Sequence, residues 1–164
     1  MKTLQNLFED GLRDIYYAEE KILEALSQMA DAANEEEVEA AFTEHRDQTE
    51  GQVQRLKQVF ELIGREAKGK ACPAIDGILK EGEEILKDYR DSPALDAGMI
   101  AAAQAVEHYE MARYGTLVSW AGQLGFNDAM ELLEATLEEE KLTDDLLTQL
   151  AEEIANPEAA ESGE

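Results

Sequence analysis

The stretch from Ala101 to Leu117 reads AAAQAVEHYEMARYGTL, and it places charged side chains inside an apolar, helix-forming run. Positions that recur every third or fourth residue form one face of an α-helix, and a face of this kind packs against neighbouring helices. Glu107 and Glu110 fall on that face, three residues apart and therefore close in space. The face reads Ile100, Ala103, Glu107, Glu110, Tyr114, Leu117, Ala121 and Leu124. The stretch predicts a long helix with carboxylates in the middle of its buried side.

The rest of the chain has the same helical spacing, and no alternating run predicts a strand. We predict long helices over residues 3–31, 35–63, 94–124 and 127–155, and a shorter helix from Pro73 to about Asp88. Two hairpins joined by one long connection are typical of a ferritin-like fold. We therefore expect an all-α, ferritin-like antiparallel four-helix bundle over residues 1–155, with the short helix in the crossover between the second and third long helices. Residues 156–164 are expected to form a flexible, acidic tail.

The buried faces of the other three long helices are also interrupted by polar residues near their midpoints. Glu19 interrupts the first, His45 the second, and Glu140 with Asp144 the fourth. Glu19 lies 14 residues before a turn near Ala33, and His45 lies 12 residues after that turn. At about 1.5 Å per residue the difference is only a few ångströms, and the second hairpin gives a similar match. All the interruptions are therefore expected at one level of the bundle.

Ionised carboxylates are too costly to bury unless positive charge is supplied, and no lysine or arginine falls on these faces. Bound metal ions are the simplest source of that charge. Carboxylates with one imidazole suit iron or manganese better than zinc, which favours cysteine and histidine. Two ions would balance the negative charge better than one, so the interruptions predict a metal centre in the bundle core.

Other interpretations of the same residues stay open. If the helical phase is different, the acidic residues are solvent-exposed charges like Glu20 and Glu138. Gln48 could bind a metal through its carbonyl oxygen or only donate and accept hydrogen bonds. His108 should point to a flank of its helix and support the site or the packing. Tyr114 either packs in the core or hydrogen-bonds a carboxylate.

Composition limits the partners. The chain of 164 residues carries 38 acidic and 14 basic residues, a formal net charge of -24 that repels nucleic-acid phosphates and anionic membranes. We therefore expect no nucleic-acid or membrane partner. The N-terminal residues do not have the pattern of a signal peptide, which predicts a cytoplasmic protein. Cys72 is the single cysteine, so an internal disulfide and a thiolate zinc cluster are excluded.

Four stretches carry a resemblance to a known family: DIYYAEEKIL (14–23), AFTEHRDQTEGQVQRL (41–56), AAAQAVEHYEMARYGTL (101–117) and LLEATLEEEKLTDDLL (132–147). Together they resemble the YciF-type, stress-associated ferritin-like proteins of bacteria, over about residues 1–155. The resemblance implies a usually dimeric ferritin-like bundle with a carboxylate-rich dinuclear metal centre and no firmly assigned reaction. The metal ligands that it implies are Glu19, His45, Glu107, Glu110, Glu140 and Asp144.

Two features depart from the usual di-iron pattern, which has Glu-x-x-His on two helices. The second long helix offers His45 and Gln48, and the fourth offers Glu140 and Asp144. The resemblance implies a glutamate where this chain has Gln48. Loss of that anion weakens one of the two metal positions.

These observations support two main hypotheses of function. The first is a di-iron protein that oxidises Fe(II) or reduces oxygen or peroxide, with manganese as the other candidate metal. The alternative is a non-catalytic metal-binding, structural or interaction protein of the stress response. A storage cage would require a large hollow oligomer. We expect a homodimer instead, because the short helix is more apolar than a crossover needs and either covers the bundle or joins two copies.

Overall fold

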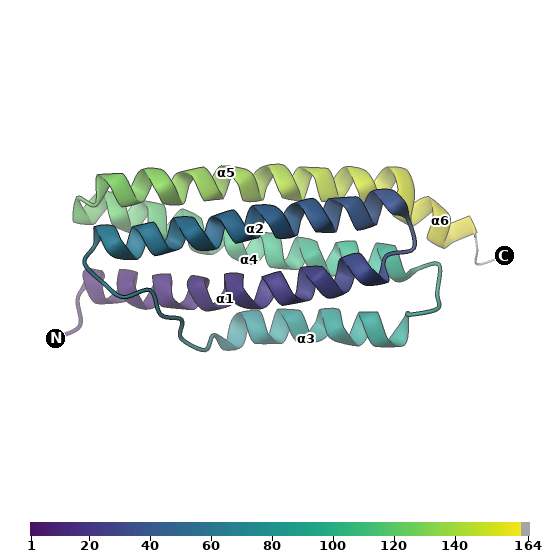
Figure 1. The fold of residues 1–164 in the computed structure, drawn as a ribbon, viewed down its shortest axis with the longest axis horizontal. Helices are drawn as coiled ribbons and strands as arrows, with labels where there is room; N and C mark the ends of the chain where they lie inside the picture. The colour runs from purple at the N-terminus through teal and green to yellow at the C-terminus, as the bar shows by residue number, and fades with distance from the viewer. Residues whose placement is uncertain (162–164) are drawn as a thin grey trace.

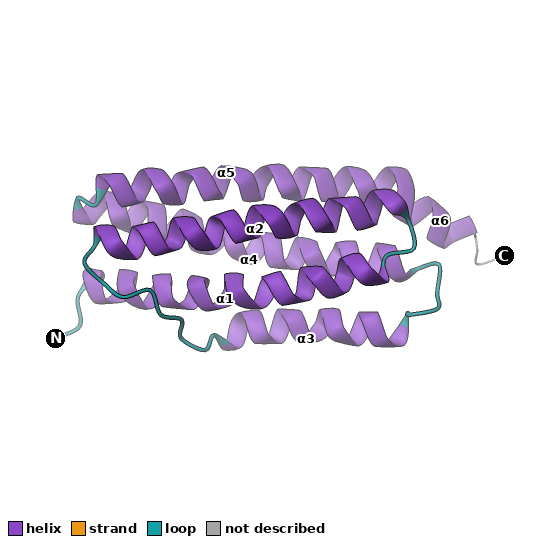
Figure 2. Cartoon of the chain, viewed as in Figure 1, coloured by secondary structure: helices purple, strands orange, loops and turns teal. Residues whose placement is uncertain are grey.

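The structure, a computed structural model, describes residues 1–161, and all regular secondary structure in this range is helical (Figure 2). The helices are α1 (Leu4–Ala32), α2 (Glu36–Leu62), α3 (Pro73–Asp88), α4 (Leu95–Leu124), α5 (Asn127–Leu150), a π-helical turn (Ala151–Ala155) and α6 (Asn156–Glu161). The expected all-α class is confirmed. The first three long helices begin and end within one residue of the predicted positions.

The four long helices lie side by side, as Figure 1 shows. α1 packs against α2 and α4, and α5 packs against α4 and α2. Each of these neighbouring pairs is antiparallel, because α1 and α5 run in one direction and α2 and α4 in the other. α3 lies outside these four helices, along α4 and α1. The long connection from α2 to α4 therefore covers one side of the helical assembly.

Local sequence explains where these helices start and stop. Thr3 begins α1 with a capping box, in which its side chain accepts from the backbone of Asn6 and the Asn6 side chain accepts in return. Asp96, buried in α4, accepts from the backbone N–H groups of residues 34 and 35, both at 2.9 Å, and so caps the start of α2. Gly125 ends α4 with a φ of 76°, a left-handed conformation that favours glycine.

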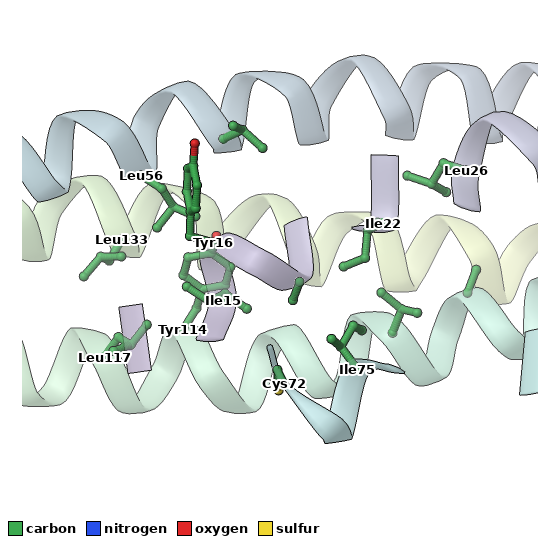
Figure 3. Packing of buried hydrophobic residues seen from close by; sticks show 14 of the residues in the cluster. Ile15, Tyr16, Ile22, Leu26, Leu56, Cys72, Ile75, Tyr114, Leu117 and Leu133 are labelled. Atoms are coloured by element: carbon green, nitrogen blue, oxygen red, sulfur yellow. The ribbon is translucent and has the colours of Figure 1, made fainter. Parts of the chain in front are cut away.

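The apolar core has two parts, one on each side of a polar layer. In α1 the buried side chains before and after Glu19 are Phe8, Leu12, Ile15, Tyr16, Ala18, Ile22, Leu26 and Met29. Figure 3 shows Ile15 with Tyr114 and Leu117 toward one end of the assembly, and Ile22 with Leu26 toward the other. Each fully buried aliphatic side chain stabilises the fold by about 1.5–3 kcal/mol. The two apolar parts fix the helices on both sides of the layer.

The predicted end of the last long helix is wrong. Helical structure does not stop at Ala155 but continues through the π turn into α6. The π turn widens the helix just before Pro157, whose ring nitrogen cannot donate a hydrogen bond. Ala155 is buried, which holds this turn against the rest of the structure. The flexibility of residues 156–164 stays a prediction, and residues 162–164 lie outside the described range.

Across residues 1–161, no helix combines the length and the apolar character that crossing a membrane requires.

Candidate metal centre

Five of the six expected ligands converge at the middle of the four long helices. They are Glu19 from α1, His45 from α2, Glu107 and Glu110 from α4, and Glu140 from α5. The four glutamates are 0% exposed and the histidine is 4% exposed. One ligand atom each from His45, Glu107, Glu110 and Glu140 lies within 4.8 Å of all the others. This geometry is that of a site which could hold a cation.

Glu19 completes the polar layer beside that group. The hydroxyl of Tyr114, fully buried in α4, donates a short hydrogen bond to Glu19 Oε1. The other oxygen, Oε2, is buried and has no hydrogen-bond partner. The prediction that Tyr114 either packs or hydrogen-bonds a carboxylate resolves here, since it does both. Tyr114 therefore fixes one Glu19 oxygen and leaves the second one available.

The remaining polar atoms of the layer are unsatisfied. Both carboxylate oxygens of Glu107, Glu110 and Glu140, and both ring nitrogens of His45, are buried without a hydrogen-bond partner. Asp96 makes the contrast clear, because that buried carboxylate accepts two backbone hydrogen bonds. A buried polar group without a partner is strongly unfavourable, so native proteins satisfy nearly all of them. The layer therefore needs protons or cations that the protein chain does not supply.

One contact within the layer supports the cation. His45 Nε2 lies 2.8 Å from Glu107 Oε1, the distance of an ion pair, yet the angles between the two groups do not form a hydrogen bond. An N–H that points elsewhere cannot neutralise the carboxylate. Two unprotonated donor atoms at this distance repel each other unless a positive charge lies close to both. The pair is arranged as two ligands of one ion would be.

Burial changes the protonation of these groups. It raises the pKa of Glu19 to about 8, and the charge of Glu140 adds to this effect. It also raises the pKa of Glu107 and Glu110 well above the ordinary value, with neighbouring carboxylates reinforcing the shift. Burial lowers the pKa of His45 to about 4, so its imidazole is neutral at neutral pH and keeps a lone pair for a metal. Without a cation, the carboxyl groups retain protons.

Asp144, the sixth expected ligand, is not brought into the cluster. It lies on the flank of α5, where Oδ2 is 3.1 Å from His108 Nε2 and Oδ1 accepts from Gln104. The buried face of α5 instead passes through Thr143, one residue earlier. Because adjacent residues on a helix differ by about 100° in direction, this small change of phase moves Asp144 out of the core. The expectation that His108 points to a flank is confirmed, and its side chain is 67% exposed.

Gln48 and Thr143 meet across α2 and α5. Thr143 Oγ1 donates to Gln48 Oε1 at 2.9 Å. The carbonyl oxygen that could have bound a metal therefore accepts a hydrogen bond, which favours the second of the two interpretations of Gln48.

A basic side chain near the layer was missed by the sequence analysis. Arg55 of α2 donates to both oxygens of Glu139, at 2.8 and 2.9 Å, and to Thr136 Oγ1 at 2.7 Å. Gln52, fully buried, also donates to Glu139. Arg55 and Glu139 neutralise each other, so the arginine does not balance the charge of the layer. Arg55 follows Gln52 by three residues, one helical turn, and this spacing was the signal in the sequence that Arg55 lies near the layer.

The comparisons with known proteins agree with this structure. Residues 3–160 match the family model described as a domain of unknown function (DUF892). The chain is 42% identical over 160 residues to protein YciF of Escherichia coli (strain K12), covering 97% of this chain and 96% of that protein. The crystal structure of the E. coli stress protein YciF is similar, with a TM-score of 0.88 and 43% identity, covering 92% of this chain and 96% of that one.

A second solved structure, YcfI from Rhodopseudomonas palustris, has a TM-score of 0.86 and 44% identity, covering 90% of this chain and 94% of that one. Matches of this length include all four long helices that carry the polar layer. The chain belongs to the DUF892 family, together with YciF.

Proposed function

We propose that this protein is a ferritin-like four-helix bundle with a crossover helix, and that its buried polar layer binds two metal ions. The observation that carries the proposal is the set of four fully buried glutamates whose oxygens are almost all without hydrogen-bond partners. Four carboxylates contribute four negative charges, and two divalent cations contribute four positive charges. Two ions therefore neutralise the layer, whereas one ion leaves two charges buried.

Iron is the metal that the donor set favours, with manganese as the alternative. The layer offers carboxylate oxygens and one neutral imidazole, without any thiolate. His45, Glu107, Glu110 and Glu140 would hold one ion. Glu19, kept in place by Tyr114, would hold the second ion together with Glu110 and Glu140, the two carboxyl groups that interact with it most directly.

The proposed reaction is the oxidation of Fe(II), coupled to the reduction of oxygen or peroxide. A pair of iron ions supplies the electrons for such a reaction. The chain's own residues exclude bulk water from the four glutamate side chains, which are 0% exposed. The Tyr114 hydroxyl stays protonated and donates to Glu19 Oε1, which holds this carboxyl group in place. In the metal-free protein burial raises the pKa of Glu19 to about 8, so metal binding near neutral pH would displace a proton from it.

A second candidate is a metal-binding protein without turnover. It is favoured by Gln48, which is neutral, accepts from Thr143 and adds no charge to the second metal position. A weakly held second ion would leave a structural or sequestering centre. The stress association of YciF leads us to place either function in a stress response. The cytoplasmic location stays a prediction from the sequence.

Metal analysis of Glu140→Gln and of a matched control tests the proposal. After purification in metal-replete medium, we expect about two iron or manganese ions per wild-type chain by elemental analysis, and fewer than one for Glu140→Gln. Glu138→Gln is the control, because Glu138 lies on the same helix, is exposed and pairs with Lys141. Metal-free wild type, or equal metal content in the two variants, would refute the metal site.

Turnover is tested separately. Ferrous ion is added to the metal-free protein in air, and oxygen consumption is followed. Catalysed consumption that is lost in Glu140→Gln and kept in Glu138→Gln supports the oxidase. Stoichiometric metal binding without consumption above the buffer rate supports the second candidate.

We also propose a homodimer. The outer surface of α3 and α4 leaves Ile85 half-buried and Tyr89 49% exposed, beside a hollow lined by Ala101 and Ala105. Light scattering should give twice the mass of 18.2 kDa, and a monomeric mass would contradict the dimer.

A further inference from the structure

A cavity of about 300 Å³ lies between α1, α3 and α4, on the side that α3 covers. The proposed metal ligands other than His45 do not line it. His45 does, and it connects this space to the polar layer. The volume is at the lower end of the range for small-molecule sites in proteins. The crossover helix therefore encloses a space that reaches a residue of the polar layer.

The cavity is elongated, and its walls are largely aliphatic in the interior and polar toward solvent. Along α1 its lining extends from Tyr17 to Met29, which at 1.5 Å per residue corresponds to roughly 18 Å. Small residues, among them Ala25, Ala103 and Gly82, leave room between the helices. The larger apolar side chains are Ile22, Leu26, Ile78, Leu79, Leu86 and Val106. A long, narrow space with aliphatic walls fits a linear chain better than a compact ring system.

The exposed edge of the cavity carries charges of both signs. Lys21 and Lys80 line it together with Glu24 and Glu83, and all four are exposed. A polar head group at this edge would remain hydrated, and it would face both positive and negative side chains. Binding should therefore depend on the length of the chain inside the cavity more than on the charge of its head.

His45 is the residue at which this cavity meets the polar layer. Its side chain is 3% exposed, and both of its ring nitrogens lack a hydrogen-bond partner. The charged and amide side chains that also line the cavity, Lys21, Glu24, Gln28, Asp76, Lys80 and Glu83, are exposed, whereas His45 is buried. One end of a chain that occupied the cavity would lie against this ring.

We propose that this cavity binds an unbranched aliphatic chain of medium length, with its polar head at the edge formed by Lys21 and Lys80 and its other end against His45. Binding of the chain does not depend on the metal centre. The placement of its inner end next to the metal ions, as a substrate or effector, rests on the proposed function. The geometry assigns α3 as the helix that covers the bound chain.

A chain-length series tests the binding. Hexanoate, octanoate and decanoate, below their micelle-forming concentrations, are titrated into the metal-free, full-length protein in a calorimeter. Each further methylene buried should tighten binding about fourfold. 1-Octanol should bind within about tenfold of octanoate, because the edge carries both charge signs. No binding, or affinity that does not depend on chain length, would overturn the proposal.

A pair of variants locates the site. Ala25→Phe, which fills the cavity from α1, should abolish decanoate binding. Ala135→Phe makes the same change on the exposed face of α5, away from the cavity, and should bind like wild type. Should Ala25→Phe lose its helical circular dichroism, Ala25→Leu, a smaller replacement, should still weaken binding at least about tenfold. Equal binding by the Ala25 and Ala135 variants would overturn the site.

Cobalt(II) separates this inference from the proposed function. When the ion is bound in the polar layer, decanoate should change its visible absorption in wild type and leave it unchanged in Ala25→Phe. A bound cobalt spectrum that decanoate does not alter would overturn the placement against His45. If cobalt does not bind at all, the metal proposal fails, while the calorimetric series still decides whether the cavity takes the chain.

Discussion

Tyr114 and Glu19 come from adjacent long helices and meet inside the polar layer. The tyrosine is fully buried, and burial next to carboxylates raises its hydroxyl pKa well above the ordinary value, so it stays a donor. A buried glutamate that loses this donor has no partner for either oxygen. At the scale of single residues, the site therefore depends on one hydroxyl group that is not itself an expected ligand.

We expect Tyr114→Phe to destabilise the metal-free protein by about 1–3 kcal/mol, because it removes the hydrogen bond to a buried acceptor. Urea unfolding measures this change. Tyr89→Phe is the control, since Tyr89 is 49% exposed and the loss of its hydroxyl should change stability by less than about 0.5 kcal/mol. A Tyr114→Phe protein as stable as this control would show that Glu19 does not need the hydroxyl.

Asp144→Asn tests the boundary of the cluster. Because Asp144 lies on the flank with His108 and Gln104, we expect the variant to keep the full metal content of wild type. Elemental analysis beside Glu140→Gln measures it. If Asp144→Asn loses metal as Glu140→Gln does, Asp144 is a ligand in the loaded protein, and α5 turns or its side chain moves on metal binding.

At the scale of the elements, α5 shows what a sequence can and cannot predict. Glu140 and Asp144 were both predicted on its buried face, and the structure buries Glu140 but not Asp144. One turn before Glu140, helical spacing allows either Thr136 or Leu137 to face the core, and Leu137 is the more hydrophobic of the two. The structure buries Thr136 instead, because its hydroxyl accepts from an arginine of α2. The contact between Arg55 of α2 and Thr136 decides which residues of α5 face the core. The sequence of α5 alone does not predict this contact.

The other long helices were predictable because their buried faces carry no such competition. In α4 every residue of the predicted face except the terminal Leu124 is buried, and in α1 Glu19 is buried among apolar residues of the same spacing, so the convergence of Glu19, Glu107 and Glu110 could be derived from spacing. The π turn at Ala151–Ala155 could not be predicted from spacing, because Asn156 and Pro157 predict an end to the helix. In the structure Ala155 is buried and the helix continues into α6.

Arg55→Ala tests how α2 and α5 are joined. The variant loses three hydrogen bonds to Glu139 and Thr136, and we expect a loss of about 1–2 kcal/mol in the free energy of unfolding, since the pair is only partly exposed. Lys141→Ala, which breaks an exposed pair within α5, should cost about 0.5 kcal/mol or less. Equal losses from the two substitutions would mean that the Arg55 contacts do not fix α5.

At the scale of the whole molecule, the two hairpins enclose a layer of acid that is almost completely cut off from water. Burial raises the pKa of Glu19, Glu107, Glu110 and Glu140 in the folded state, while unfolding restores their ordinary value of 4.5. The folded state therefore holds more protons than the unfolded state at pH values between the ordinary pKa of 4.5 and the raised pKa values. The stability of the metal-free protein must fall as the pH rises through this interval.

We expect the melting temperature of the metal-free protein to fall between pH 6.5 and 8, up to the folded pKa of Glu19, about 8. Above 6.5, its ordinary pKa, His45 is mostly neutral in both states and contributes little. Moderate salt should be present in all samples to screen the net charge of -24. Calorimetric melting at several pH values measures the trend.

With metal bound, cations replace these protons, so the melting temperature should rise or stay level over the same interval. The metal-free Glu140→Gln variant has one ionisable group fewer and should show a weaker decline. A metal-free protein that melts at the same temperature from pH 6.5 to 8 would contradict the raised pKa values.

The antiparallel layout divides this acidic layer between the two halves of the chain. The α1–α2 hairpin brings Glu19 and His45, and the α4–α5 hairpin brings Glu107, Glu110 and Glu140. Produced as separate polypeptides, each hairpin would expose its share to solvent, where carboxylates are fully hydrated. The free energy of recombining the fragments would then include the cost of dehydrating the layer, and its change on adding a cation would show how far the ion offsets that cost.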